Sequence, residues 1–128
     1  MKWNRKKRIE ELPKLLKKKI LVLDGAMGTM IQAEKLTEED YRGERFKDHK
    51  KSLFGNNDIL SITQPDLISN IHLAFLKSGS SVIETNSFSS TSISQDDYLM
   101  SDLAYELNLQ SAKIARSICD QYEKQFPN

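Results

Sequence analysis

The stretch ILVLDGAMGTMIQA, residues 20–33, decides the expected fold. Its first four residues form a short apolar run that predicts a buried strand, and this strand ends at a tight turn made by Asp24 and Gly25. Residues 27–33 predict a short helix directly after the turn. A strand followed by a turn and a helix is the repeating unit of parallel α/β folds.

Two later stretches repeat this order. Residues 58–62 and 81–85 predict the second and third strands. A helix is predicted between Pro65 and Gly79, and a long one from about residue 101 to residue 126. Three strands do not complete a parallel fold, and the glycine spacing after the first strand does not match a dinucleotide-binding fingerprint. The predicted class is therefore α/β, as a partial (β/α)8 barrel containing the first three βα units preceded by an N-terminal helix.

The chain is expected to have two parts, a basic amphipathic helix at residues 1–18 and the truncated barrel at residues 19–128. Residues 1–19 carry nine lysines and arginines against two glutamates. Such a run is compatible with nucleic acid or a membrane surface, but its apolar residues share one helical face and it holds a single aromatic residue, Trp3. We favour a solvated helix, with Pro13 as a possible break, and expect neither nucleic acid nor membrane as a partner.

Composition points to a cytoplasmic protein. The apolar run at residues 20–23 is far shorter than the core of a secretory signal, which spans roughly 7–15 residues. No stretch approaches the roughly 20 apolar residues of a membrane span. A single cysteine, Cys119, excludes an intramolecular disulfide and fits a reducing compartment.

Three stretches carry a resemblance to a known family: LVLDGAMGTMIQ at residues 21–32, YRGERF with GNNDILSITQP at 41–46 and 55–65, and SGSSVIETNSFSSTSI at 78–93. Each is similar to a motif of the homocysteine S-methyltransferases, and their order and spacing match as well. The second stretch resembles the cobalamin-dependent methionine synthases in particular. The resemblance covers about residues 19–126 and implies the N-terminal part of the homocysteine-binding domain.

This resemblance implies methyl transfer from methylcobalamin and 5-methyltetrahydrofolate to homocysteine, which gives methionine. The chain is then expected to be a fragment of such an enzyme and inactive alone. Its expected partners are homocysteine, the remaining barrel segments, and the folate and cobalamin domains if these are encoded separately. The alternative is a free-standing binding or regulatory module built from the first βα units.

Five residues are predicted to bind homocysteine: Asp24, Gly25, Ala26, Thr85 and Asn86. The carboxylate of Asp24 is suited to an ammonium group, and the backbone N–H groups of the following turn are suited to a carboxylate. The resemblance implies that Asp24, Gly25 and Thr85 line the pocket. It also places Ala26 where many relatives have glycine, which matters only if the backbone there has a positive φ. The alternatives are a simple turn at Asp24 and a cap at Thr85.

No catalytic or metal-binding residue is predicted in this chain. The resemblance implies that the full-length enzymes use cobalamin, and a zinc ion that three cysteines hold. Zinc keeps the substrate sulfur deprotonated at neutral pH. This chain offers only Cys119, His49 and His72, which lack ligand spacing, so neither cofactor is expected on the chain alone. Asn57 and Asp58 are expected to tie the long loop before them to the barrel mouth.

Overall fold

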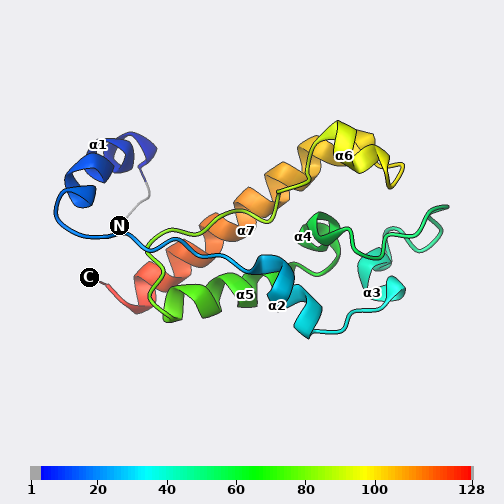
Figure 1. Ribbon diagram of the computed structural model, residues 1–128, viewed down its shortest axis with the longest axis horizontal. Coiled ribbons are helices and arrows are strands. Elements are labelled where there is room, and N and C mark those ends of the chain that lie inside the picture. The colour runs from blue at the N-terminus through cyan, green and yellow to red at the C-terminus, as the bar shows by residue number, and fades with distance from the viewer. Residues whose placement is uncertain (1–3, 128) are drawn as a thin grey trace.

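The computed structural model describes residues 4–127, and its regular elements within that range are helical (Figure 1). Six α-helices and two short 3-10 helices follow α1 in chain order. The helices are α1 (Arg5–Leu16), α2 (Met27–Ala33), α3 (Glu38–Arg42), α4 (Leu60–Thr63), α5 (Pro65–Lys77), α6 (Ser92–Asp96) and α7 (Ala104–Gln125). The 3-10 helices are η1 (Asn57–Ile59) and η2 (Ser101–Leu103).

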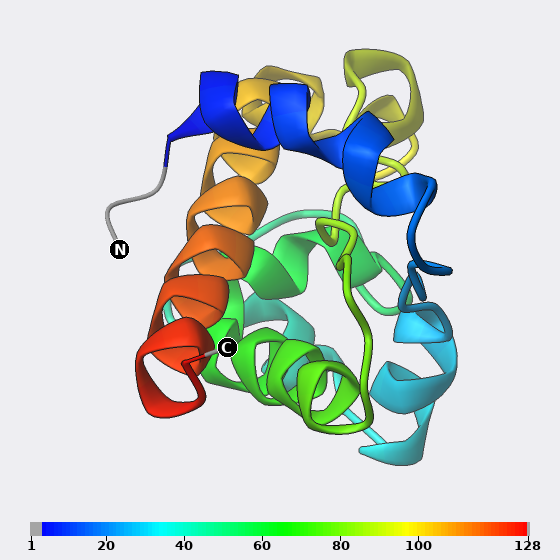
Figure 2. The same cartoon turned by 90° about the vertical axis from the view of Figure 1, so that its left-hand side faces the viewer.

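Within the helix predicted at residues 1–18 the structure has α1, Arg5–Leu16, and residues 1–3 of that prediction lie outside the described residues. The cap of α1 is Asn4, whose side chain accepts a hydrogen bond of 3.0 Å from the N–H of Lys7. Pro13 lies inside α1 without ending it. α1 buries none of its residues, and it lies at the same end of the molecule as the C-terminal end of α7 (Figure 2). An ion pair of 2.7 Å between Arg8 and Glu123 joins the two helices.

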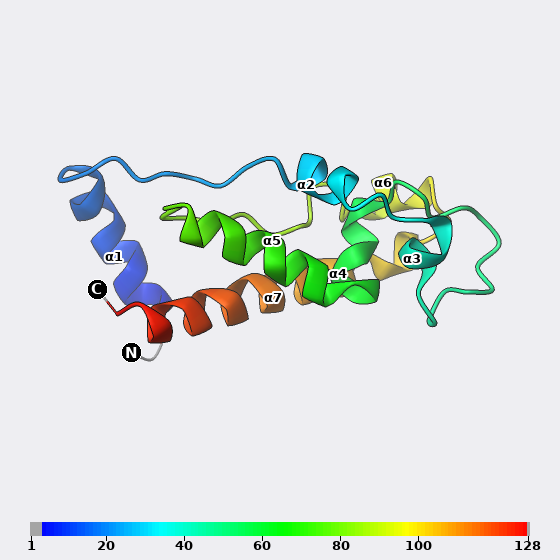
Figure 3. The same ribbon diagram turned by 90° about the horizontal axis from the view of Figure 1, so that it is seen from below.

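The core lies where α4, α5 and α7 pack together. Figure 3 shows the extended chain before α2, then α5, then α7 as successive layers. Pro65 stands at the first position of α5, as predicted, because its missing N–H needs no partner there. None of the helices within residues 4–127 is long and apolar enough to cross a membrane. The buried apolar core contains Ile31, Tyr41, Leu53, Ile59, Leu60, Ile68, Ile71, Met100 and Leu107.

The predicted α/β class, a partial (β/α)8 barrel, is wrong. Residues 4–127 contain no sheet, and the second predicted strand, residues 58–62, is helical instead, in η1 and α4. Ile59 and Leu60 are both 0 % exposed. An apolar run of this length is compatible with a strand or with a buried helical turn, and its packing against α5 and α7 selects the helix.

The first and third predicted strands meet without forming a ladder. They run parallel and share one isolated bridge between Leu23 and Val82. The N–H of Ser81 donates to the carbonyl of Val22 at 2.7 Å, and the N–H of Asp24 donates to the carbonyl of Val82 at 3.0 Å. A parallel pair is the weaker kind of pairing, and two strands alone are marginal in water. These segments are also largely exposed, so their pairing stays local.

Candidate functional site

A cleft of 510 Å³ opens where the two extended segments end. The turn at residues 24–28 and the segment at residues 84–89 form two of its walls, and residues 55–58, with side chains around α6, form the rest. All five predicted homocysteine-binding residues line it: Asp24, Gly25, Ala26, Thr85 and Asn86. Four acidic residues and no lysine or arginine are among the described lining residues, so the cleft favours a cationic ligand group.

Asp24 joins the two walls of the cleft. Its Oδ1 accepts a hydrogen bond of 2.9 Å from the N–H of Glu84, and its side chain is only 4 % exposed. Its Oδ2 lies 3.9 Å from Nδ1 of His72, a residue of α5. The carboxylate is therefore held at the inner edge of the cleft, and contact between it and a ligand stays a prediction.

The turn after Asp24 has an unusual backbone. Ala26 has φ 49° and ψ 25°, in the left-handed region, and forms the N-cap of α2 without a side-chain hydrogen bond. Its carbonyl accepts a hydrogen bond of 3.0 Å from the N–H of Met30. A positive φ strains alanine but not glycine. Alanine at residue 26 was expected from the sequence to matter only if φ is positive there, and φ is positive.

Replacing Ala26 by glycine should stabilise the protein. The left-handed conformation costs alanine roughly 1–2 kcal/mol, and glycine removes this cost. Glycine also has a larger entropy in the unfolded state, which offsets roughly 0.5–1 kcal/mol of the stabilisation. We expect a net gain of about 0.5–1 kcal/mol in the free energy of unfolding, measured by urea denaturation. Ala33→Gly, at the last residue of α2, has no left-handed strain to relieve and should be destabilising.

Thr85 and Asn86 play different parts. Thr85 is exposed, and its hydroxyl lies 2.6 Å from Oγ of Ser87, so it caps no helix. Asn86 is buried, and its Nδ2 donates to the carbonyl of Asn57 at 2.8 Å and to Oγ of Ser61 at 3.2 Å. The Asn86 side chain therefore braces the cleft wall, whereas the Thr85 hydroxyl is accessible to a ligand.

A buried polar cluster supports the opposite wall. Asn56 and Gln95 pair through their amides at 2.8 and 3.2 Å, and the carboxylate of Asp58 accepts hydrogen bonds from the N–H of Ser89 at 2.8 Å and from Ser90 Oγ at 2.6 Å. Burial raises the pKa of Asp58, although these two hydrogen bonds oppose the rise. Asp58 thus ties the long loop to the segment after Thr85, whereas the barrel mouth to which it was expected to tie the loop does not form. Sequence reasoning missed Gln95.

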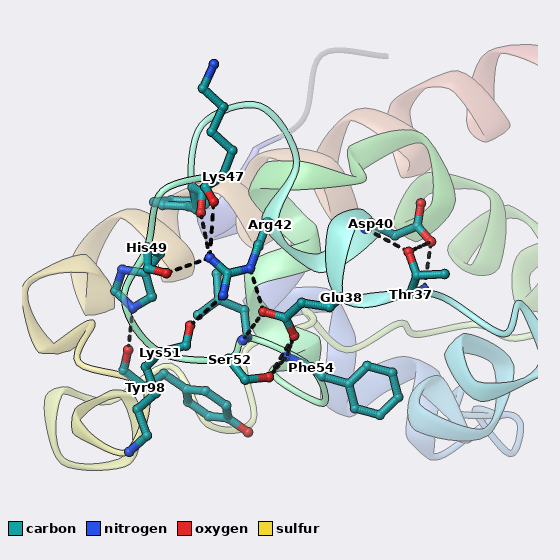
Figure 4. A network of polar contacts seen from close by, with 12 residues as sticks. Thr37, Glu38, Asp40, Arg42, Lys47, His49, Lys51, Ser52, Phe54 and Tyr98 are labelled. Atoms are coloured by element: carbon teal, nitrogen blue, oxygen red, sulfur yellow. Dashed lines mark hydrogen bonds and ion pairs between the residues drawn. The ribbon is translucent and has the colours of Figure 1, made fainter.

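The long loop at residues 43–56 is held in place by a second network, shown in Figure 4. Glu38 accepts hydrogen bonds from Arg42 Nε at 2.6 Å, from Ser52 Oγ at 2.7 Å, and from the N–H groups of Leu53 at 2.8 Å and Phe54 at 2.7 Å. The guanidinium of Arg42 donates to four loop carbonyls in turn. This network fixes the loop whose last residues line the cleft.

The potential metal donors lie apart. The Nε2 of His49 is 2.7 Å from the carbonyl oxygen of Tyr98, His72 is fully buried, and burial raises the pKa of the partly buried Cys119 thiol on α7. Within residues 4–127 no group of three or more His, Cys, Asp or Glu side chains has a geometry that would hold a metal ion. The donor set described here therefore does not fit the zinc that the resemblance implies.

Comparison with known families agrees with the motifs around the cleft. The model of the homocysteine S-methyltransferase family matches residues 21–127. The match begins just before the turn at Asp24 and includes the whole segment around Thr85. Since it spans most of the sequence, the chain belongs to the homocysteine S-methyltransferase family.

Proposed function

We propose that this chain supplies part of the homocysteine pocket of a methionine synthase, in which the methyl group comes from methylcobalamin and 5-methyltetrahydrofolate. The observation that carries this proposal is the cleft itself. It gathers residues predicted from two separate family motifs, and its described lining has carboxylates but no basic side chain. An amino-acid substrate carries an ammonium group that such a lining attracts.

Each group has a role in this proposal. The Asp24 carboxylate provides the negative charge that attracts the ammonium group, from a position 4 % exposed at the inner edge of the cleft. The exposed Thr85 hydroxyl and the backbone N–H groups of the turn at Gly25 and Ala26 are donors for the substrate carboxylate. Asn86 and Asp58 keep the walls in place through the hydrogen bonds described above.

The proposed chain binds substrate without completing the reaction. A thiol is a poor nucleophile until it is deprotonated, and zinc bound by cysteines supplies that activation when it is present. The described residues do not form such a site, since Cys119 is remote from the cleft lining and its thiol is held protonated by burial. Methyl transfer therefore needs donor groups other than those described here.

Binding of homocysteine tests the proposal. The full chain, kept reduced, is titrated with L-homocysteine and followed by NMR, and the resonances of the turn at residues 24–28 should shift in a saturable manner. Thr85→Val should weaken binding about three- to tenfold, because one hydrogen bond to a charged group is lost. Thr29→Val, an exposed change outside the cleft lining, should leave the affinity unchanged. Equal affinity for both variants, or no saturable shift, would contradict the proposal.

A second candidate is a binding or regulatory module that docks a partner through α1. The observation in its favour is that α1 buries none of its residues and leaves Ile9, Leu12 and Leu16 exposed. Under this candidate, Leu12→Ser with Leu16→Ser would abolish partner binding, while the homocysteine titration would show no saturable shift. The two candidates are therefore separated by the same titration.

A further inference from the structure

His72 has an unusual environment for a titratable residue. Its side chain is 0 % exposed, and neither ring nitrogen has a hydrogen-bond partner among the residues that the structure describes. Buried polar atoms are almost always paired, because an unpaired one loses its hydration without compensation. Both ring nitrogens therefore lack the hydrogen bond that a buried imidazole usually forms.

The polar group available to His72 is the carboxylate of Asp24. Nδ1 and Oδ2 are 3.9 Å apart, about 1 Å more than an ordinary N–H to O hydrogen bond. Oδ1 is occupied by the N–H of Glu84, whereas Oδ2 retains unused acceptor capacity. A small movement of the exposed chain around Leu23 would close the remaining distance without disturbing α5.

We propose that His72 is a positioning residue for Asp24: its neutral ring donates from Nδ1 to Oδ2 and orients the carboxylate toward the ammonium group of the substrate amino acid. This inference deepens the proposed function and rests on it for the identity of the ligand. The donor to Asp24 must be uncharged, because the carboxylate has to keep its negative charge to attract the ammonium group. A lysine or arginine in the same place would orient the carboxylate too, but it would cancel the negative charge that attracts the ammonium group.

The electrostatics of the pair agree with a neutral ring. Burial lowers the pKa of His72, and the nearby charge of Asp24 opposes the decrease. Asp24 is the one charged group whose field on His72 is resolved in the described part of the chain. The ring is therefore uncharged at neutral pH, with its single proton free to sit on either nitrogen, and the carboxylate selects Nδ1.

The first test needs no ligand. In the full chain with nitrogen-15-labelled histidine, NMR distinguishes the two neutral tautomers, and His49 serves as the internal reference because its Nε2 lies 2.7 Å from the carbonyl of Tyr98. We expect His72 in the Nδ1–H tautomer and His49 in the Nε2–H tautomer. Asp24→Asn should move the His72 ring resonances and leave those of His49 in place. An Nε2–H tautomer for His72 in the unmodified chain would overturn the inference.

The second test separates positioning from general support of the fold. His72→Phe fills the same space without a donor, and it should weaken L-homocysteine binding about tenfold while leaving the affinity for 4-mercaptobutanoate, which lacks the ammonium group, unchanged. His72→Asn places a donor near Nδ1 and should restore much of the loss. Equal losses for both ligands would show a structural role and overturn the inference. If the unmodified chain fails to bind homocysteine, the proposed function fails, and the tautomer still decides the role of His72.

Discussion

Glu38→Gln is expected to destabilise the protein by about 2–4 kcal/mol, because the charged carboxylate accepts several hydrogen bonds at once. The carboxylate receives hydrogen bonds from two backbone N–H groups, Ser52 Oγ and the Arg42 guanidinium. An amide turns one acceptor oxygen into a donor. Its NH2 group would face either the Arg42 guanidinium and the N–H of Leu53, or the N–H of Phe54 beside the Ser52 hydroxyl, which can accept. Against a total stability of roughly 5–15 kcal/mol, such a loss is large.

The control is Glu39→Gln, one residue further along α3. Glu39 is exposed, and among the residues that the structure describes none forms a side-chain hydrogen bond or ion pair with it. We expect its replacement to change the free energy of unfolding by less than about 0.5 kcal/mol. Urea denaturation of both variants at neutral pH measures the difference. A similar effect of the two changes would show that the network in Figure 4 contributes little.

The same carboxyl predicts a pH dependence. Burial favours the neutral form of Glu38, but the hydrogen bonds from Leu53, Ser52, Phe54 and Arg42 outweigh it and lower the pKa below the ordinary value of 4.5. Its stabilisation is therefore complete above the ordinary pKa and is lost as the pH falls through the lower pKa of the folded protein. Other carboxyls titrate in this range, so the difference between the unmodified chain and Glu38→Gln, which should shrink toward acid pH, isolates Glu38.

Gly43→Ala is expected to cost about 2–4 kcal/mol, because strain and crowding add at this position. Gly43 ends α3 with φ 52° and ψ −168°, a conformation that residues with a Cβ rarely adopt. A Cβ there would also lie 3.2 Å from Cβ and 3.3 Å from Cγ2 of Thr63 in α4. The close approach of α3 to α4 thus depends on the missing side chain.

Two comparisons separate the two causes. Gly55 also has a positive φ, of 86°, but a Cβ there would have no heavy atom within 4 Å, so Gly55→Ala reports strain alone, about 1–2 kcal/mol. Thr63→Ser removes the Cγ2 atom and should recover part of the Gly43→Ala loss in a double-mutant cycle. Thermal and urea unfolding measure all four variants. A Gly43→Ala cost no larger than that of Gly55→Ala would show that crowding plays no part.

The helices could be predicted from local signals. Pro65 and Gly79 marked helix ends, and the helices predicted at residues 27–33 and between Pro65 and Gly79 agree with α2 and α5 to within two residues. The short helix α3 was missed, although its signal is present. Thr37 and Asp40 form a reciprocal capping box, a pattern that predicts a helix start from sequence alone.

The strands could not be predicted correctly, because a strand depends on its neighbours. The run at residues 20–23 has the composition of a buried strand, yet Ile20 is 89 % exposed. Composition cannot report whether a sheet exists for such a run to join. In the candidate site, some residues could be predicted from the sequence and others could not. Its five residues were placed by motif, whereas Gln95 and His72 contribute through contacts between distant segments that no local pattern reveals.

The bond between the Glu84 N–H and Asp24 spans 60 residues of sequence. Closing a loop of that length from an unfolded chain costs roughly 4 kcal/mol of entropy, more than a few exposed hydrogen bonds return. We therefore expect this bond to form after the helices of the core have packed and brought the two segments near each other. We expect the cleft to be the last part of the described structure to fold and the first to open in native fluctuations. A ligand that contacts both walls should stabilise their closed arrangement. It should therefore slow amide exchange in the two segments more than in the helical core.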